Sequence, residues 1–392
     1  RRWPQDRRLA EIPIASGYAI EYNFNVLQDA VNAQDGGTIS VTEYSAVGNG
    51  TTDDTAAFQA ALAWASTQAR SSIYIPPGRY LISGVLTPPT TPCTIKGAGM
   101  EATVLDMGTS THNLFYRAPV AEGTYADLAF ETFAVEGNWL NNKASVDDTY
   151  PFLIWDTDRL RWSMVRVRYS NIYGTAARRC REVTVTGCQI IECARTGISV
   201  TACSYAQVVN NWIDHCDDDA IDVHVRDDTT TSIRQGFVIS GNRIADCQGI
   251  EAFGARRGVI SGNQLERCRF NGIGLSYTSS EGNAAPIALA ITGNVITDMI
   301  NRNGIDGLNN SGDYISIRTL RQAGSGAAAP GDPNTATGAF IQLYSNVENL
   351  NDDAATAQAG GHDLIIANNI CMRTLPTVAT YSLWGYGSMF TR

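Results

Sequence analysis

The chain has 392 residues, of which 44% are hydrophobic and 36 are glycine, and its formal net charge is −10. This acidic balance argues against a nucleic-acid-binding protein, and no apolar run approaches the length of a membrane span. The composition fits an all-β protein with short strands and many turns.

Residues 1–38 are predicted to form an irregular lead-in with a short helix around residues 25–33. The chain starts Arg1-Arg2-Trp3, without a methionine and without a hydrophobic signal core. We therefore expect it to be a processed or truncated product of a longer chain.

The segment 41–86 predicts a helix followed by a strand. Asp53 and Asp54 can cap a helix, whose apolar face would hold Phe58, Ala61, Leu62 and Ala65. Residues 73–75 then predict a strand that runs into the turn Pro76-Pro77-Gly78. An amphipathic helix at this place is expected to cover the open end of a solenoid core.

Six later stretches repeat one short phrase. They are VTVTGCQI (183–190), AQVVNNWI (206–213), FVISGNRI (237–244), GVISGNQL (258–265), LAITGNVI (289–296) and LIIANNIC (364–371). The first five turn positions, Cys188, Asn211, Asn242, Asn263 and Asn294, are separated by 23, 31, 21 and 31 residues. A strand-like repeat of this length, with loops inserted in alternate copies, indicates a parallel β-helix.

This alignment places asparagines in one column along the stack and cysteines in another. The asparagines are predicted to form a ladder at a tight bend, where asparagine tolerates a left-handed φ and its amide can bond up and down the stack. Five residues beyond the turn come Cys193, Cys216, Cys247 and Cys268. We expect these cysteines to be reduced thiols in the core, since the total of nine is odd and free cysteine behaves as a small hydrophobe. A β-sandwich of alternating strands explains neither column.

Residues 41–105, including Lys96-Gly97-Ala98-Gly99, resemble the N-terminal signature of the pectate-lyase-like superfamily, and the resemblance continues as a repeat pattern to about residue 371. It implies an all-β fold, a right-handed parallel β-helix with an N-terminal capping helix. The expected divisions are a lead-in (1–38), a β-helix domain (39–373, with the cap at 41–86) and a C-terminal tail (374–392). The superfamily includes polygalacturonases, alginate epimerases and phage tailspike depolymerases, so the resemblance specifies fold better than reaction.

A second column suggests where chemistry lies. In each coil an isoleucine expected to point inward is followed by a residue that should point outward. These outward residues are Ser199, Asp222, Glu251, Gly274 and Asp306. Asp222 and Glu251 fall on adjacent coils, and two close carboxylates supply the acid and the base that glycoside hydrolysis needs. We expect Glu251 to be the acid, because Phe253 and Gly274 offer it a less polar setting. The alternative is a solvated acidic face on an acidic protein.

The run Asp217-Asp218-Asp219 just before this strand resembles the Asp-Asp motif of polygalacturonases, which implies catalytic roles for Asp218 and Asp219. The rest of that family pattern is absent: Arg195-Thr196-Gly197 stands where an Asn-X-Asp is expected, and Gln248-Gly249-Ile250 where a Gly-His-Gly is expected. The alginate-epimerase Asp-Pro-His-Glu motif is absent as well. A polar turn and a calcium site at Asp217–Asp219 are the other interpretations of the run.

A lyase acting on a uronate polymer is the alternative reaction. It needs cations to neutralise the uronate carboxylate and a base to remove the C5 proton. The candidate substrate-binding residues are His224, Phe253, Arg226, Arg256 and Tyr277, and Arg257 belongs to the same cationic set. Each of these is also an ordinary surface residue on an arginine-rich protein.

The sequence thus predicts a polysaccharide depolymerase, a glycoside hydrolase in preference to a lyase, that acts through Asp222, Glu251, Asp219 and Asp218 without a cofactor. A noncatalytic adhesion or tail protein is the remaining class. Resemblance to tailspikes implies a homotrimer in a virion tail, and a secreted or periplasmic bacterial enzyme is the alternative location.

Overall fold

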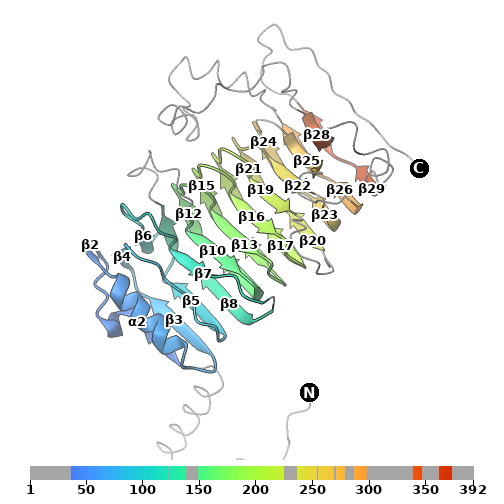
Figure 1. Ribbon diagram of the computed structural model, residues 1–392. Helices are drawn as coiled ribbons and strands as arrows, with labels where there is room; N and C mark the ends of the chain where they lie inside the picture. The colour runs from blue at the N-terminus through green and yellow to red at the C-terminus, as the bar shows by residue number, and fades with distance from the viewer. Residues whose placement is uncertain are drawn as a thin grey trace, which may run out of the picture.

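The computed structural model describes residues 37–121, 123–137, 149–224, 236–253, 255–268, 271–278, 287–297, 339–346 and 362–372. The expected lead-in helix and the tail 374–392 lie outside these ranges. The described strands form three long parallel sheets, which stack as in a parallel β-helix (Figure 1). The fold class predicted from the repeats is therefore confirmed.

Sheet A has 11 strands. They are β1 (Thr38–Ser40), β3 (Ser71–Ile75), β5 (Cys93–Gly97), β8 (Tyr125–Glu131), β11 (Thr157–Ser163), β14 (Thr184–Thr186), β17 (Ala206–Val209), β20 (Phe237–Ser240), β23 (Arg256–Ser261), β26 (Ile287–Thr292) and β29 (His362–Ala367).

Sheet B also has 11 strands. They are β2 (Asn49–Asp53), β4 (Gly78–Leu81), β6 (Thr103–Asp106), β9 (Ala134–Glu136), β12 (Arg166–Arg168), β15 (Gln189–Ile191), β18 (Trp212–Asp214), β21 (Arg243–Ala245), β24 (Gln264–Glu266), β27 (Val295–Thr297) and β30 (Ile370–Met372).

Sheet C has eight strands and carries the candidate site. They are β7 (Phe115–Arg117), β10 (Phe152–Trp155), β13 (Thr175–Arg178), β16 (Ile198–Thr201), β19 (Ile221–His224), β22 (Ile250–Phe253), β25 (Asn271–Thr278) and β28 (Ala339–Asn346). From β5 onward the described strands visit sheets A, B and C in turn, one coil after another.

The N-terminal end of the core is covered as expected. A 3-10 helix η2 (Val41–Tyr44) leads to helix α2 (Thr55–Ala65), which buries Ala57, Phe58, Ala61, Leu62 and Ala65. The Phe58 ring packs against Tyr80 of β4 at 5.4 Å between centroids. Asp54 occupies the N-cap position without capping the helix through its side chain. Its carboxylate instead accepts hydrogen bonds from the Val47 and Gly48 amides.

The asparagine ladder is formed where the chain passes from sheet A to sheet B. Asn242 is 1% exposed. Its Nδ2 donates to the Val208 carbonyl at 2.8 Å and to Asn263 Oδ1 at 2.9 Å, while its own Oδ1 accepts from the Asn211 amide at 3.0 Å. The expectation of a left-handed φ at these asparagines is wrong, because the left-handed residue is the preceding one, such as Gly241 with φ 66°. That preceding residue makes the bend, and the asparagine side chain can then turn inward.

The thiol column lies at the next corner, between sheets B and C. Cys193, Cys216, Cys247 and Cys268 are all fully buried and not disulfide-bonded. The Cys216 amide donates to Cys247 Sγ at 3.3 Å, so adjacent coils meet here through sulfur. Burial also raises the pKa of another core thiol, Cys188, to about 12. These cysteines act as packing groups rather than reactive ones.

Candidate active site

The outer face of sheet C carries two carboxylates on neighbouring strands. Ile221 and Val223 of β19 point into the core, which leaves Asp222 on the outside. Asp222 pairs in register with Glu251 of β22, which lies between the core residues Ile250 and Ala252. The exposed fractions of Asp222 and Glu251 are only 7% and 3%. The alternative of a solvated acidic face is therefore wrong for this pair.

Asp218 and Asp219 join the pair from the corner that precedes β19, and both are half-buried. Burial, together with the charges of Asp218, Glu251 and Asp222, raises the pKa of Asp219 well above its usual value, against the opposing effect of Arg195. The four carboxyl groups therefore interact as one cluster. Because ionising all four would bring like charges close together, the cluster favours a state in which at least one carboxyl group is protonated.

Asp222 differs from Asp219 in its hydrogen-bonded setting. Burial raises the pKa of Asp222, whereas His224, Arg178 and a hydrogen bond from Ser199 act in the opposite direction. Ser199 Oγ donates to Asp222 Oδ2 at 3.1 Å. The other oxygen, Oδ1, is buried and has no hydrogen-bond partner in the described structure. One oxygen of Asp222 is thus held by Ser199, and the other is unpaired among the described residues.

An aromatic and cationic group borders the carboxylates on the N-terminal side. The guanidinium groups of Arg178 and Arg195 each lie 5.4 Å from the centre of the Tyr173 ring. Arg195 also approaches Asp218, with 3.4 Å between Nε and Oδ2. Tyr173 packs edge-on against Tyr150, with ring centroids 5.4 Å apart. This arrangement gathers aromatic rings and positive charge beside the carboxylates.

Sequence reasoning named neither Tyr173 nor Arg178 as a site residue, and it treated Arg195 only as a mismatch to a family motif. A usable signal existed, because Arg195 and Asp218 are 23 residues apart, which is the spacing of one coil in this region. Arg178 lies one coil before Thr201 in the register of sheet C. Coil-by-coil alignment of the residues flanking the strands would have found both arginines.

The remaining predicted residues are distributed unevenly. His224 lies two residues beyond Asp222 on the same strand and is half-buried, and it pairs in register with Phe253. Tyr277 lies on β25 of sheet C. Arg256 begins β23 of sheet A together with Arg257, so neither lies with the carboxylates on sheet C. Arg226 lies outside the described residues.

The outward column also ends differently from the prediction. Gly274 follows Glu251 in register as expected, but its next partner is Gln342 of β28. Asp306 lies outside the described residues. The short Gly-Ile-Asp phrase matched the column locally, whereas the pairing with β25 is made by a strand much further along the chain.

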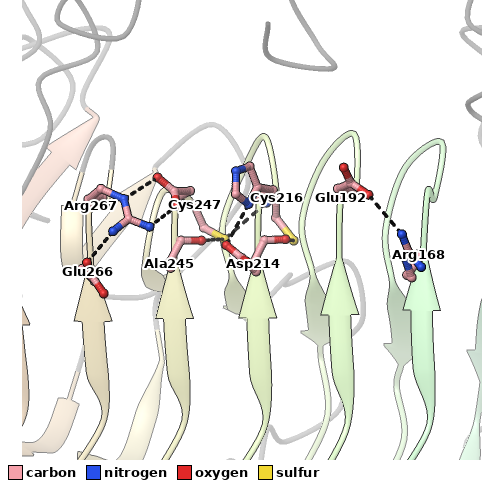
Figure 2. A network of polar contacts seen from close by, with 10 residues as sticks. Arg168, Glu192, Asp214, Cys216, Ala245, Cys247, Glu266 and Arg267 are labelled. Carbon is pink, nitrogen blue, oxygen red and sulfur yellow. Dashed lines mark hydrogen bonds and ion pairs between the residues drawn. The ribbon is translucent and has the colours of Figure 1, made fainter. Parts of the chain in front are cut away.

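A separate polar network follows the ends of the sheet B strands (Figure 2). In the described residues, Asp214, His215 and Asp246 bring one ligand atom each within 4.8 Å of one another, while Asp217–Asp219 form no such group. His215 Nδ1 lies 2.8 Å from Asp214 Oδ1. Arg267 donates to both oxygens of Asp246, so an arginine already balances part of the negative charge that a cation would need. The network therefore links successive coils through ion pairs.

The 11-residue helix α2 is the longest helix among the residues that the structure describes, and none of these helices could cross a bilayer.

A family model described as rhamnogalacturonase A/epimerase, pectate lyase-like, matches residues 38–274. The chain is 35% identical over 117 residues to a mannuronan C5-epimerase of Azotobacter vinelandii, a match that covers 28% of this chain and 6% of the epimerase. It is 26% identical over 252 residues to the preneck appendage protein of Bacillus phage PZA, which covers 59% of this chain and 26% of the phage protein. The chain thus matches only a minor part of the length of these relatives.

Two solved structures share the fold. The family 28 exopolygalacturonase of Yersinia enterocolitica superposes with a TM-score of 0.54 at 14% identity, covering 85% of this chain and 66% of that one. The catalytic unit of a GH87 α-1,3-glucanase from Streptomyces thermodiastaticus gives a TM-score of 0.52 at 20% identity, covering 69% of this chain and 56% of that one. At this level of identity, both likenesses concern the fold.

Proposed function

The chain belongs to the pectate lyase-like family of the rhamnogalacturonase A/epimerase type, and from that premise we propose that it is a glycoside hydrolase that cleaves a polysaccharide. The observation that carries the proposal is the cluster of Asp218, Asp219, Asp222 and Glu251 on one face, in which the pKa of Asp219 is raised by burial and by its carboxylate neighbours. Glycoside hydrolysis needs one carboxyl that is protonated and one that is ionised.

The roles follow from the local settings. Asp222 accepts a hydrogen bond from Ser199 on Oδ2 and keeps Oδ1 unpaired, which suits a nucleophile or a base that activates water. The leaving oxygen then receives its proton from a neutral carboxyl. Glu251 is the first candidate for that role, and the raised pKa of Asp219 makes Asp219 a second candidate.

Positive charge beside the cluster favours a substrate that carries carboxylates. Arg178 and Arg195 flank the Tyr173 ring within reach of the site, and guanidinium groups bind planar carboxylates well. The sugar ring can stack on an aromatic face while an arginine binds its acidic group. A uronate-containing polysaccharide fits this combination.

A uronate lyase or epimerase is the second candidate, favoured by one specific observation. His224 lies beside Asp222 on β19 and influences its carboxylate electrostatically, so a carboxylate and an imidazole face the same outer surface. Removal of a proton from C5 needs a base of this kind together with a cation that stabilises the resulting carboxylate charge. The matched segment of a mannuronan C5-epimerase is consistent with such a reaction.

We place the protein either in a virion tail or outside the bacterial cell. The match to a phage appendage protein over 252 residues supports the first location, and the secreted enzymes typical of such β-helices support the second. A tail protein of this architecture is expected to work as a homotrimer. The corresponding noncatalytic hypothesis is that the protein binds a surface polysaccharide without cleaving it.

The decisive experiment incubates the protein with capsular, lipopolysaccharide and plant polysaccharides and measures product masses. Hydrolysis adds one water to each cleavage, whereas a lyase leaves an unsaturated end that absorbs ultraviolet light. An epimerase keeps chain length and changes the sugar configuration seen by NMR. Products with added water support the proposal, and binding with unchanged polymer mass and configuration supports the noncatalytic reading.

A further inference from the structure

Three side chains on adjacent coils of sheet C are joined by hydrogen bonds that lead to one oxygen of Asp222. Arg178 Nη1, from β13, donates to Ser199 Oγ of β16 at 2.8 Å. Ser199 Oγ in turn donates to Asp222 Oδ2 of β19 at 3.1 Å. Ser199 is 1% exposed, so this hydroxyl is shielded from water.

The direction of these bonds is determined by the chemistry of the groups. A guanidinium has only donors, so Ser199 must accept from Arg178. Its single proton then has two acceptors within reach, Asp222 Oδ2 at 3.1 Å and Thr201 Oγ1 at 3.4 Å. The charged and nearer acceptor wins, because hydrogen bonds to carboxylates are shorter and stronger than those between neutral groups.

We propose that Arg178 and Ser199 are positioning residues that commit Asp222 Oδ2 to accepting a hydrogen bond, which leaves Oδ1 as the atom that acts on the substrate. We call the hydrogen bonds from Arg178 through Ser199 to Asp222 the relay. The relay rests on the proposed function in one respect only, namely that Asp222 is the base or nucleophile. Its effect on the ionisation of the Asp222 carboxyl does not depend on a bound substrate.

The relay acts within a crowded set of charges. The titratable and charged groups around Asp222 are His224 on its own strand, Arg178 on β13, Glu251 on β22, Asp218 and Asp219 at the preceding corner, and Tyr173. Burial and Asp218 favour the neutral carboxyl, while His224, Arg178 and Ser199 favour the ionised one. Loss of the Ser199 hydroxyl removes one of the groups that keep Asp222 ionised.

The test compares Ser199→Ala with Ser199→Thr, which keeps a hydroxyl, and with Thr201→Val. The last variant removes a hydroxyl group that Arg178 also contacts but that makes no hydrogen bond to Asp222 among the described residues. The Asp222 carboxyl is titrated by carbon-13 NMR in protein labelled at aspartate, with Asp222→Asn identifying its signal. The pH dependence of turnover is measured on the same variants.

We expect Ser199→Ala to raise the pKa of Asp222 by about one unit, since a hydrogen bond to a charged group contributes on that scale. The acidic limb of the turnover profile should move upward by the same amount, with recovery at higher pH. Ser199→Thr should restore both values, and Thr201→Val should move them less. Arg178→Gln should shift the titration in the same direction if Ser199→Ala folds poorly.

An unchanged Asp222 titration in Ser199→Ala and Arg178→Gln overturns the relay, whatever the activity. A uniform loss of turnover at every pH also overturns it, because a merely structural residue behaves in that way. If the titration shifts while Asp222→Asn remains active, the relay stands and the proposed role of Asp222 in catalysis fails. The two failures are therefore distinguishable.

Discussion

Asp222 of β19 and Glu251 of β22 are paired in register on adjacent coils, and both are buried although they lie on the outer side of the sheet. A carboxylate at either position lacks bulk water, so each depends on its neighbours for the stabilisation of charge. In this respect the pair differs from the exposed acidic side chains of an ordinary protein surface. The first two predictions follow from this difference.

Replacing Asp222 by Asn or Glu251 by Gln keeps the shape and removes the titrating group. Each change should lower turnover on an identified polysaccharide by about a hundredfold or more. Neither variant should lower the melting temperature substantially, so that the loss of turnover is not a loss of folding. Gln207→Ala, at an exposed position on sheet A, is the matched control and should leave turnover unchanged. Near wild-type turnover in both carboxyl variants contradicts the assignment.

The acid can be identified with an activated leaving group. A variant that lacks the general acid should cleave an aryl glycoside with a good leaving group far better than it cleaves the polymer, because that leaving group needs no proton. Comparing Asp219→Asn with Glu251→Gln assigns the role to the variant that is rescued. Asp222→Asn should not be rescued, since it lacks the base or nucleophile. Rescue of Asp222→Asn instead would reverse the roles.

The pH dependence of stability follows from the raised pKa of Asp219. Between the pKa of this carboxyl in the unfolded chain and its higher value in the folded protein, the folded state binds more protons, so stability falls as pH rises. Asp219→Asn should therefore raise the melting temperature at neutral pH, and the difference should vanish below about pH 4.

Asp127 should give the opposite dependence of stability on pH. Its hydrogen bond with Arg159 lowers the pKa of Asp127, so this carboxylate contributes stability above its unfolded pKa and loses it as pH falls. Asp127→Asn should lower the melting temperature slightly at neutral pH, because the pair is partly exposed. Thermal scans of both variants across pH test the signs together, and equal signs would contradict the prediction.

Replacing an asparagine in the interior of the ladder should lower the free energy of unfolding strongly. Asn242→Ala leaves the Asn211 amide and the Val208 carbonyl without their partners in a dry interior, which should destabilise the protein by roughly 3 kcal/mol. Asn369→Ala, at the last ladder position and half-buried, should cost much less. Denaturant unfolding measures the difference, and equal costs would mean that the ladder adds little beyond packing.

Assembly can be tested at an apolar stripe on sheet A. Val238, Val259, Ala290 and Ile365 lie next to one another in register on four adjacent coils, and Ile365 is 59% exposed. If the chain is a homotrimer, this stripe is a suitable contact. Light scattering should give the trimer mass, and Val259→Asp should dissociate it while Gln264→Asp, at an exposed position on sheet B, should not. A monomer mass for the unchanged protein at micromolar concentration contradicts the trimer.

The sequence by itself determined the repeating coil, the inward isoleucines, the asparagine and cysteine columns and the neighbouring positions of Asp222 and Glu251. These features are local, because each coil repeats the same short pattern and a strand alternates its side chains between two faces. Once the first coils are aligned, the register of the next is implied by the spacing. The same logic explains why helix α2 could be predicted from its apolar face.

Tertiary structure alone decided the rest. The pairing of Gly274 with Gln342 joins two strands that are far apart in the chain, because stacking selects a strand by its fit to the coil below and not by its distance along the chain. Burial of Asp222 and the relay through Ser199 arise from residues on three coils meeting on one face. The sequence pattern of one coil does not predict these contacts between coils. Their strength depends on how far the side chains are removed from water and on the charges nearby.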